Sequence, residues 1–325
     1  MACLKQGITL FVCIACQLMF PGRLYTGSFN PFADKPTGKE IKRFGAGIIS
    51  DGLANRDMAI SPDGNELFYT IQLKTQVSII AHSKKNGNNW SEPEVAWFSG
   101  IHNDLEPAFS PDGSRLYFSS KRPLVYGQAK NDFDIWYLEK SSSGWSDPIH
   151  MPAPLNTGAD EYYPSVTRKG DIYFTRDTGE NKEDILIARR NGHRYETAER
   201  LSAAINSAGY EFNAWVDPDE TFILFTGYNR KDGIGNGDLY ISLKGPDGKW
   251  LPAKNPVFIN SSYLDYCPFV SADKKYLFFS SNRSGLAQPF TEKTNLKALK
   301  TELFSAGNGN DDIYWVELSA VMSSV

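Results

Sequence analysis

Short runs of alternating apolar and polar residues, separated by tight-turn signals, recur along most of this chain. The clearest example is residues 106–120, which read EPAFSPDGSRLYFSS. Its Pro-Asp-Gly centre is typical of a tight turn, because Pro restricts φ and Gly accepts a positive φ. The aromatic-rich runs on both sides alternate as strands do, so the stretch predicts a β-hairpin.

This hairpin occurs in five copies at a spacing of roughly fifty residues, which lies in the range of propeller repeats. The copies read MAISPDG, PAFSPDG, PSVTRKG, AWVDPDE and PFVSADK, and the residue before the turn pair is Ser61, Ser110, Thr167, Asp217 and Ser271. Each copy continues with a second and a third strand, and most then have a segment that opens with Trp. The pattern predicts an all-β fold, a five-bladed β-propeller of four-stranded blades.

The two ends of the repeat array complement each other. Residues 39–44 resemble a fourth-strand segment that precedes the first hairpin, whereas the fifth copy ends soon after its third strand. We therefore expect an N-terminal strand to close the ring in the last blade, because closure removes exposed strand edges. The predicted organisation is a leader over residues 1–20, a tether over 21–38, the propeller over 39–318 and a short tail over 319–325.

Repeats of the form E-x-P-x-F-S-P-D-G-x-x-L-Y-F-x-S, followed by D-I-Y, resemble those of the Pro-Asp repeat propellers related to the periplasmic TolB translocation protein. The resemblance covers residues 39–318 and implies the propeller fold. It leaves the activity open, since the family includes export accessory proteins, peptidase-associated propellers and members without known roles. The chain departs from the repeat at Arg168-Lys169 and at Ala272-Asp273, where the Pro-Asp pair is broken.

Composition narrows the class of protein further. The net charge of −4 and the scattered Lys and Arg residues argue against nucleic-acid binding through phosphate contacts. Three of the four cysteines lie in the first 16 residues, so no disulfide framework is expected in the body. The fourth, Cys267, is expected to be a buried apolar residue, and a reactive thiol is the alternative.

The N-terminus resembles an export signal. Lys5 precedes an apolar run over residues 8–20, which is short for a membrane span. Cys16 follows Ile14-Ala15 as in a bacterial lipoprotein box, although Cys13 stands where Leu is usual. We therefore expect an exported protein, periplasmic or envelope-associated, whose membrane attachment, where there is any, is a lipid anchor at Cys16.

Two charged columns meet on one face of such a propeller. Acids lead into the first strand of each blade and arginines follow the second strand. The favoured interpretation is that they pair as clamps between segments, because Arg binds carboxylates in a bidentate manner. The alternative is a charged rim that binds an anion, a sugar or a metal. The acids are Asp104, Glu161, Glu211 and Asp265, and the arginines are Arg122, Arg176, Arg230 and Arg283.

A few residues break the repeat and are candidate ligand contacts: His102, Tyr162, Trp215 and Tyr266. Aromatic rings beside carboxylates could stack on a sugar, and packing between blades is the alternative. The four histidines are not at metal-ligand spacing, so neither a metal nor a cofactor is predicted. An insertion over residues 284–310 contains a predicted helix over 295–304, which either caps the channel, presents a surface to a partner or packs on its own blade.

Two functions remain open at this point. The first is a monomeric, non-catalytic binding or scaffold module for a cell-envelope protein or glycan. The second is a carbohydrate-active enzyme, a glycoside hydrolase or lyase, that would use the rim carboxylates. Such an enzyme needs two accessible carboxyls, one with a raised pKa, so arginine pairing would disfavour it.

Overall fold

The computed structural model describes residues 29–325, except 76, 126, 178–181 and 287–292. The predicted leader with Cys16 and the first part of the predicted tether lie outside the described residues. Two aromatic residues of the predicted tether contact the propeller. Phe29 pairs with Trp90 through a backbone bridge, and the ring of Phe32 lies 5.1 Å from that of Phe44.

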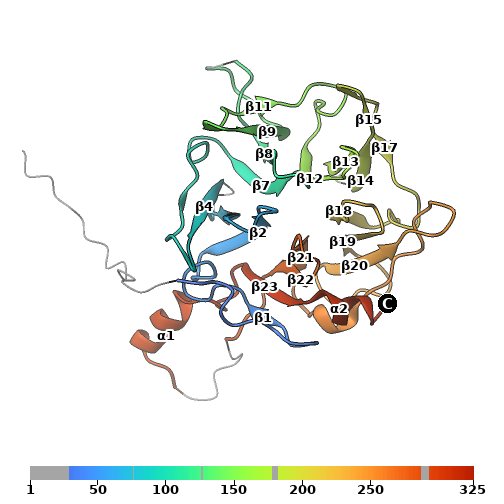
Figure 1. The fold of residues 1–325 in the computed structure, drawn as a ribbon. Coiled ribbons are helices and arrows are strands. Elements are labelled where there is room, and N and C mark those ends of the chain that lie inside the picture. The colour runs from blue at the N-terminus through green and yellow to red at the C-terminus, as the bar shows by residue number, and fades with distance from the viewer. Residues whose placement is uncertain (1–28, 76, 126, 178–181, 287–292) are drawn as a thin grey trace, which may run out of the picture.

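Five small antiparallel sheets surround a central axis (Figure 1), which confirms the predicted five-bladed propeller. The innermost strands are β2 (Ala54–Ile60), β7 (Asp104–Phe109), β12 (Glu161–Val166), β18 (Tyr210–Val216) and β21 (Asp265–Val270). The second strands are β3 (Glu66–Gln72), β8 (Arg115–Ser120), β13 (Ile172–Asp177), β19 (Phe222–Tyr228) and β22 (Tyr276–Ser281). The third strands are β4 (Ser78–Asn86), β9 (Asp134–Ser141), β14 (Glu183–Ala188), β20 (Asp238–Leu243) and β23 (Asp312–Glu317).

The outer strand of each blade is much shorter than the inner three. In the first three blades it is β6 (Glu94–Val95), β11 (Ile149–His150) and β17 (Glu199–Arg200). In the fourth blade the outer segment forms isolated bridges, Lys254 with Ile241 of β20 and Trp250 with Lys244, the residue after β20. Short hairpin extensions complete the edges, formed by β5 (Asn89–Trp90), β10 (Gly144–Trp145), β15 (Arg190–Asn191) and β16 (Arg194–Tyr195).

The N-terminal strand closes the ring as predicted. β1 (Lys42–Arg43) is the outer strand of the fifth blade and pairs with β23, Lys42 opposite Trp315. The next residue, Phe44, is fully buried and packs edge-on against Phe278 and Trp315. Burial of large aromatic rings on both sides of this junction joins the two ends of the chain. The predicted short tail begins as a helix, α2 (Leu318–Met322), which packs into the core.

The turns between first and second strands use side-chain hydroxyls to fix the backbone. In the second blade Ser110 donates to Asp112 over 2.6 Å and accepts from the Arg115 N–H over 2.9 Å. Gly113 then takes the left-handed conformation, with φ of 70°. In the fifth copy, where Pro-Asp is broken, Lys274 takes that place with φ of 55°. The departure from the repeat therefore changes the side chains of the turn and leaves the turn itself intact.

The insertion in the fifth blade forms the predicted helix, α1 (Leu296–Leu303), capped by Asn295. It lies at the periphery beside β1 and not over the axis (Figure 1), so it does not cap the channel. Its side chains are not buried, and Leu296 and Phe304 are 66% and 79% exposed. Ala298 and Leu299 are half-buried, and no residue of α1 is fully buried. All helices within the described ranges are too short or too polar to cross a membrane.

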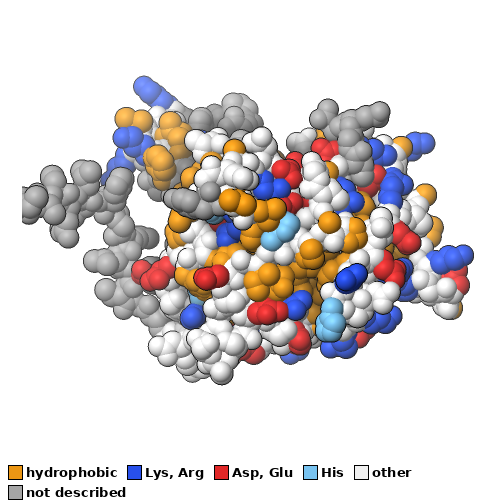
Figure 2. Space-filling view, turned by 90° about the horizontal axis from the view of Figure 1, so that it is seen from above, with side chains coloured by type: hydrophobic (Ala, Val, Ile, Leu, Met, Phe, Trp, Pro, Cys, Tyr) orange, Lys and Arg blue, Asp and Glu red, His pale blue; other side chains and the backbone are white. Residues whose placement is uncertain are grey.

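The side of the disc seen in Figure 2 mixes Lys and Arg with Asp and Glu, and hydrophobic side chains lie between them. Neither sign of charge dominates this side. A short 3₁₀ helix, η1 (Val257–Ile259), lies in the connection from the fourth blade to the fifth.

Replacing Phe44 with Ala should destabilise the protein by about 3–5 kcal/mol, because it removes a fully buried ring at the closure of the propeller. Urea unfolding followed by circular dichroism would measure the change. The matched control is Phe304→Ala, which truncates an exposed ring and should change stability by no more than about 0.5 kcal/mol. Equal unfolding midpoints for the two variants would contradict a stabilising role of the N-terminal strand.

Candidate functional site on the propeller axis

The rim carboxylates predicted as candidate site residues are fully buried, and each is paired with the arginine of its own blade. The structure thus brings the two predicted columns together, pair by pair. The pairs and their N–O distances are Arg122–Asp104 (2.8 Å), Arg176–Glu161 (2.7 Å), Arg230–Glu211 (3.1 Å) and Arg283–Asp265 (2.8 Å). We refer to them as the rim clamps.

The clamp of the third blade shows what these pairs hold. Glu161 also accepts hydrogen bonds from the hydroxyl and the N–H of Thr157, over 2.6 and 3.0 Å. Arg176 donates to the Leu155 carbonyl over 2.7 Å. One clamp therefore joins the connection from the previous blade, the inner strand and the end of the second strand. Since the polar atoms are engaged within the protein, the geometry favours the clamp interpretation over a ligand role.

A second repeated contact pins each connection to the blade before it. The side chain of Asn156 accepts from the Ile135 N–H over 2.8 Å and donates to the Ile135 carbonyl over 2.9 Å. Asn206 and Asn260 make the same pair of bonds with Ile185 and Leu239. Each of these asparagines therefore holds the connection to the third strand of the blade before it, and each lies five residues before the rim acid of the next blade.

One residue of every inner strand has a left-handed backbone near the axis. φ is 53° at Asp57, 60° at Glu106, 51° at Tyr163, 49° at Asn213 and 52° at Cys267. Each lies at a bulge, where the register between the first and second strands shifts. Positive φ is uncommon outside Gly, and such strained positions cluster at functional sites. We call these five residues the axial ring.

Glu106 is the centre of a hydrogen-bond network across this ring. Its carboxylate accepts from the Tyr163 N–H over 2.7 Å and from the Asn213 side-chain amide over 3.1 Å. The guanidinium of Arg56 lies 3.4 Å from the same carboxylate. These donors come from the first, third and fourth blades, so one buried side chain of the second blade joins four of the five.

Burial raises the pKa values of two acidic groups in this network, Glu106 and Cys267. Burial, together with the negative charge of Asp57, raises the pKa of Glu106 to about 8, and Arg56 opposes this shift. Burial also raises the pKa of the Cys267 thiol well above its usual range. The thiol is therefore protonated at neutral pH and donates to Asn213 over 3.3 Å. The predicted burial of Cys267 is confirmed, and the alternative of a reactive thiolate is disfavoured.

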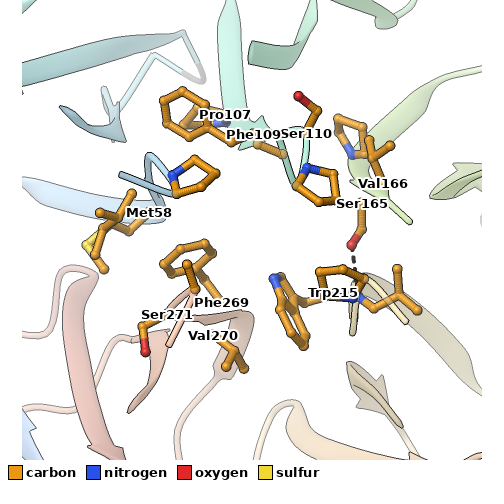
Figure 3. Close-up of a pocket in the computed structure, with 18 of the residues that line it drawn as sticks. Met58, Pro107, Phe109, Ser110, Ser165, Val166, Trp215, Phe269, Val270 and Ser271 are labelled. Atoms are coloured by element: carbon orange, nitrogen blue, oxygen red, sulfur yellow. Dashed lines mark hydrogen bonds between the residues drawn. The ribbon is translucent and has the colours of Figure 1, made fainter. Parts of the chain in front are cut away.

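The axial ring separates two cavities. The first, which we call the turn-side cavity, opens between the five hairpin turns and has a volume of about 240 Å³. Figure 3 shows Trp215 and Phe269 pointing into it from the fourth and fifth blades, with Phe109 opposite. Prolines of the inner strands and turns complete an apolar lining: Pro62, Pro107, Pro111, Pro164 and Pro218. Glu106 and Tyr163 form its base.

The second cavity lies on the other side of the ring, where the inner strands begin, and we call it the start-side cavity. Its volume is about 440 Å³. Its lining combines aromatic rings with charged and amide side chains, among them Arg56, Lys121, Tyr162, Glu183, Asn213 and Tyr266. Glu106 lines this cavity as well. The two cavities therefore differ in chemistry although the same ring residue reaches both.

The predicted contact residues are distributed over the two sides. Tyr162 and Tyr266 line the start-side cavity, whereas Trp215 lines the turn-side cavity. Of the described residues, His102 and the four rim acids are in neither lining, and His102 lies partly buried in the loop before Asp104. The sequence interpretation missed Arg56, Glu106 and Glu183. Within the described ranges, no group of three His, Cys, Asp or Glu side chains is arranged to hold a metal ion.

Solved structures with a similar fold come from different functional classes. A putative TolB from Agrobacterium tumefaciens is 16% identical, with 82% of this chain and 90% of that chain covered and a TM-score of 0.47. A thermostable family-43 glycoside hydrolase is 11% identical (81% and 89% covered, TM-score 0.48). An endo-arabinase from Bacteroides thetaiotaomicron is 15% identical (72% and 90% covered, TM-score 0.43).

At these identities the likeness concerns the β-propeller fold alone. No protein-family model matches the chain, and no curated protein sequence matches it either. The function must therefore be argued from the side chains near the axis.

Replacing Arg122 with Ala should destabilise the protein by about 3–5 kcal/mol, because the fully buried Asp104 carboxylate loses its counter-charge. The control is Arg168→Ala, which removes an exposed pair with Asp219 and should cost about 0–1 kcal/mol. Urea unfolding at neutral pH compares the two. A stable Arg122→Ala protein would show that this pair is not a clamp and would restore the rim carboxylates as candidate ligand contacts.

Replacing Glu106 with Gln should flatten the pH dependence of stability. Because the pKa of Glu106 is raised to about 8, the folded state binds a proton that the unfolded chain has released. The contribution of Glu106 to the free energy of unfolding of the wild type therefore falls as the pH rises from about 4.5 to 8. Gln keeps an acceptor and does not titrate, so the variant should lose about 1–3 kcal/mol less than the wild type over this window.

The measurement is urea unfolding at a low and a high pH within that window. Glu302→Gln, on the exposed helix α1, is the control and should follow the wild type. Parallel curves for Glu106→Gln and the wild type would show that Glu106 is ionised in the folded protein throughout.

Proposed function

We propose that this protein is an exported, non-catalytic binding propeller whose turn-side cavity receives an apolar segment of a cell-envelope protein. The observation that carries the proposal is the cavity itself, an apolar pocket on the axis lined by Trp215, Phe269, Phe109 and five prolines. Aromatic rings that line a concave surface are the usual anchors of protein recognition. Export and envelope location depend on the N-terminal sequence alone.

The size of the cavity favours side chains over a whole small molecule. Its volume of about 240 Å³ is below the range of about 300–1,000 Å³ typical of small-molecule pockets. One or two large apolar side chains of a partner would fill it. Trp215 is already packed against Phe222 on its other side, with 5.5 Å between ring centroids, so it would offer a fixed wall to the partner.

The charged side chains at the mouth of the turn-side cavity indicate which residues would flank the apolar ones in the partner. The two turns that depart from Pro-Asp bring basic side chains into the lining, Arg168 in the third copy and Lys274 in the fifth. Arg168 is 64% exposed and pairs with Asp219 at the surface, a pair of little stability that a partner carboxylate can replace. We therefore expect a segment in which acidic residues follow apolar ones.

The alternative of a glycosidase that uses the rim carboxylates is disfavoured by the rim clamps. A general acid and a nucleophile or base must both reach the substrate. Asp104, Glu161, Glu211 and Asp265 are fully buried and held by arginines, and none lines either axial cavity. A binding role needs no such group.

Selection of a peptide phage-display library on the purified protein tests the proposal. Selected peptides should share large apolar residues flanked by acids, and Trp215→Ala should weaken their binding by about tenfold or more. Tyr162→Ala, in the start-side cavity, is the matched control and should bind as the wild type does. Thermal melting would confirm that both variants fold.

Peptides that bind Trp215→Ala as tightly as the wild type would exclude the turn-side cavity as their site. The same conclusion would follow if Arg168→Glu left the preference for acidic residues unchanged. Failure to select any peptide above background would contradict the proposal as a whole.

A further inference from the structure

We propose that the start-side cavity is a second binding site and that it takes a neutral saccharide. This site lies on the opposite side of the axial ring from the turn-side cavity and is independent of the peptide proposal. The inference depends on the walls, the floor and the charge balance of the cavity.

Aromatic side chains form the walls, and their neighbours hold them in place. Tyr266 lies under the guanidinium of Arg56, 4.8 Å from its ring centroid. Tyr162 packs on Phe133, with 5.1 Å between ring centroids, and Phe212 belongs to the same cluster. A ring face exposed to a cavity binds the C–H face of a sugar while the sugar hydroxyls remain available to polar groups.

Polar groups with both donor and acceptor capacity form the floor. Arg56, Glu106 and Asn213 line the cavity and are fixed by the hydrogen bonds that cross the axis. A preorganised set of this kind loses little freedom when a ligand binds. Sugar hydroxyls both donate and accept, so they match a floor that offers amide, carboxyl and guanidinium groups together.

The charges that face the cavity are close to balance. The positive charge of Arg56 is met by Asp57 at 2.8 Å, and the carboxyl group of Glu106, 3.4 Å away, is largely neutral at pH 7 because its pKa is raised to about 8. Lys121 on one wall lies over the Phe133 ring at 4.5 Å, and Glu183 also lines the cavity. An anionic or cationic ligand would therefore find no surplus of opposite charge to offset its desolvation. A neutral polyhydroxylated ligand avoids that cost.

The volume agrees with this class of ligand. At about 440 Å³ the start-side cavity falls within the range of about 300–1,000 Å³ of small-molecule pockets, unlike the turn-side cavity. Its lining combines aromatic rings with charged and amide side chains, whereas the turn-side cavity is lined mainly by prolines and aromatics.

Saturation-transfer NMR on the full chain tests the inference. The probes are glucose, galactose, xylose and arabinose, their short oligomers, and glucuronate and glucosamine as charged comparators. At least one neutral sugar should receive saturation and bind more tightly than both charged comparators. Tyr162→Ala and Phe212→Ala should each weaken binding by about tenfold, whereas Trp215→Ala should leave it unchanged.

Three results would overturn the inference: no saturation of any neutral sugar, tighter binding of glucuronate or glucosamine, or loss of binding in Trp215→Ala with retention in Tyr162→Ala. Tyr162→Ala leaves the turn-side cavity intact. Loss of sugar binding in this variant, with unchanged peptide binding, would show that the saccharide site is distinct from the site of the proposed function. Thermal melting of each variant shows whether a loss of binding reflects unfolding.

Discussion

Five inner strands converge on one axis, and the rest of the structure depends on how the chain fills that narrow space. Each strand forms a bulge there, with a left-handed residue that costs about 1–3 kcal/mol in backbone strain. The strain is offset by contacts between neighbouring blades. The N–H of Asp57 donates to Ser280 over 3.1 Å, and the N–H of Glu106 donates to Thr70 over 3.0 Å. In each case the hydroxyl belongs to the second strand of the preceding blade.

The same bulges explain why the axis is divided into two cavities. The residues just before the axial ring, such as Arg56, Tyr162 and Tyr266, line the start side. The residues two positions after it, such as Trp215 and Phe269, line the turn side. Because Glu106 and its donors fill the space between, each side has its own chemistry. In a regular strand successive side chains would alternate between the two faces of the blade, with no break at the axis.

Much of the architecture could be predicted from the sequence because it repeats. The hairpins, the rim clamps and the closing strand recur with fixed spacing or complete a pattern, and the structure contains them. The roles of Asn156 and of the hydroxyl at Thr70 were not predicted, although both recur at equivalent places in other copies. Their contacts join segments far apart in the sequence, and spacing alone does not show which groups meet.

The axial ring was not predicted, because its residues do not repeat from one copy to the next. Its five positions carry Asp, Glu, Tyr, Asn and Cys, so no residue type repeats, and bulges have no clear sequence signal at non-Gly positions. Glu106 looked like part of the hairpin motif. The alignment of the copies did contain a signal at these positions. Core positions of a repeat usually keep one residue type, whereas the axial position has a different residue in every copy. Tyr162 and Trp215 were predicted as contact residues of one site. Tyr162 lies before the bulge of its strand and Trp215 lies after the bulge of its own, so the two side chains line opposite cavities.

Variation within the turn-side cavity has a further consequence for binding. Two residues after the axial ring, the second and third blades have Ala108 and Ser165, whereas the fourth and fifth have Trp215 and Phe269. Small side chains on two blades and large rings on two others make the lining of the cavity asymmetric about the axis. A partner seated in this cavity would meet different side chains on different sides and could therefore bind in one orientation. Five identical blades would offer five equivalent orientations, so the loss of symmetry at these positions is what makes selective recognition on this axis physically achievable.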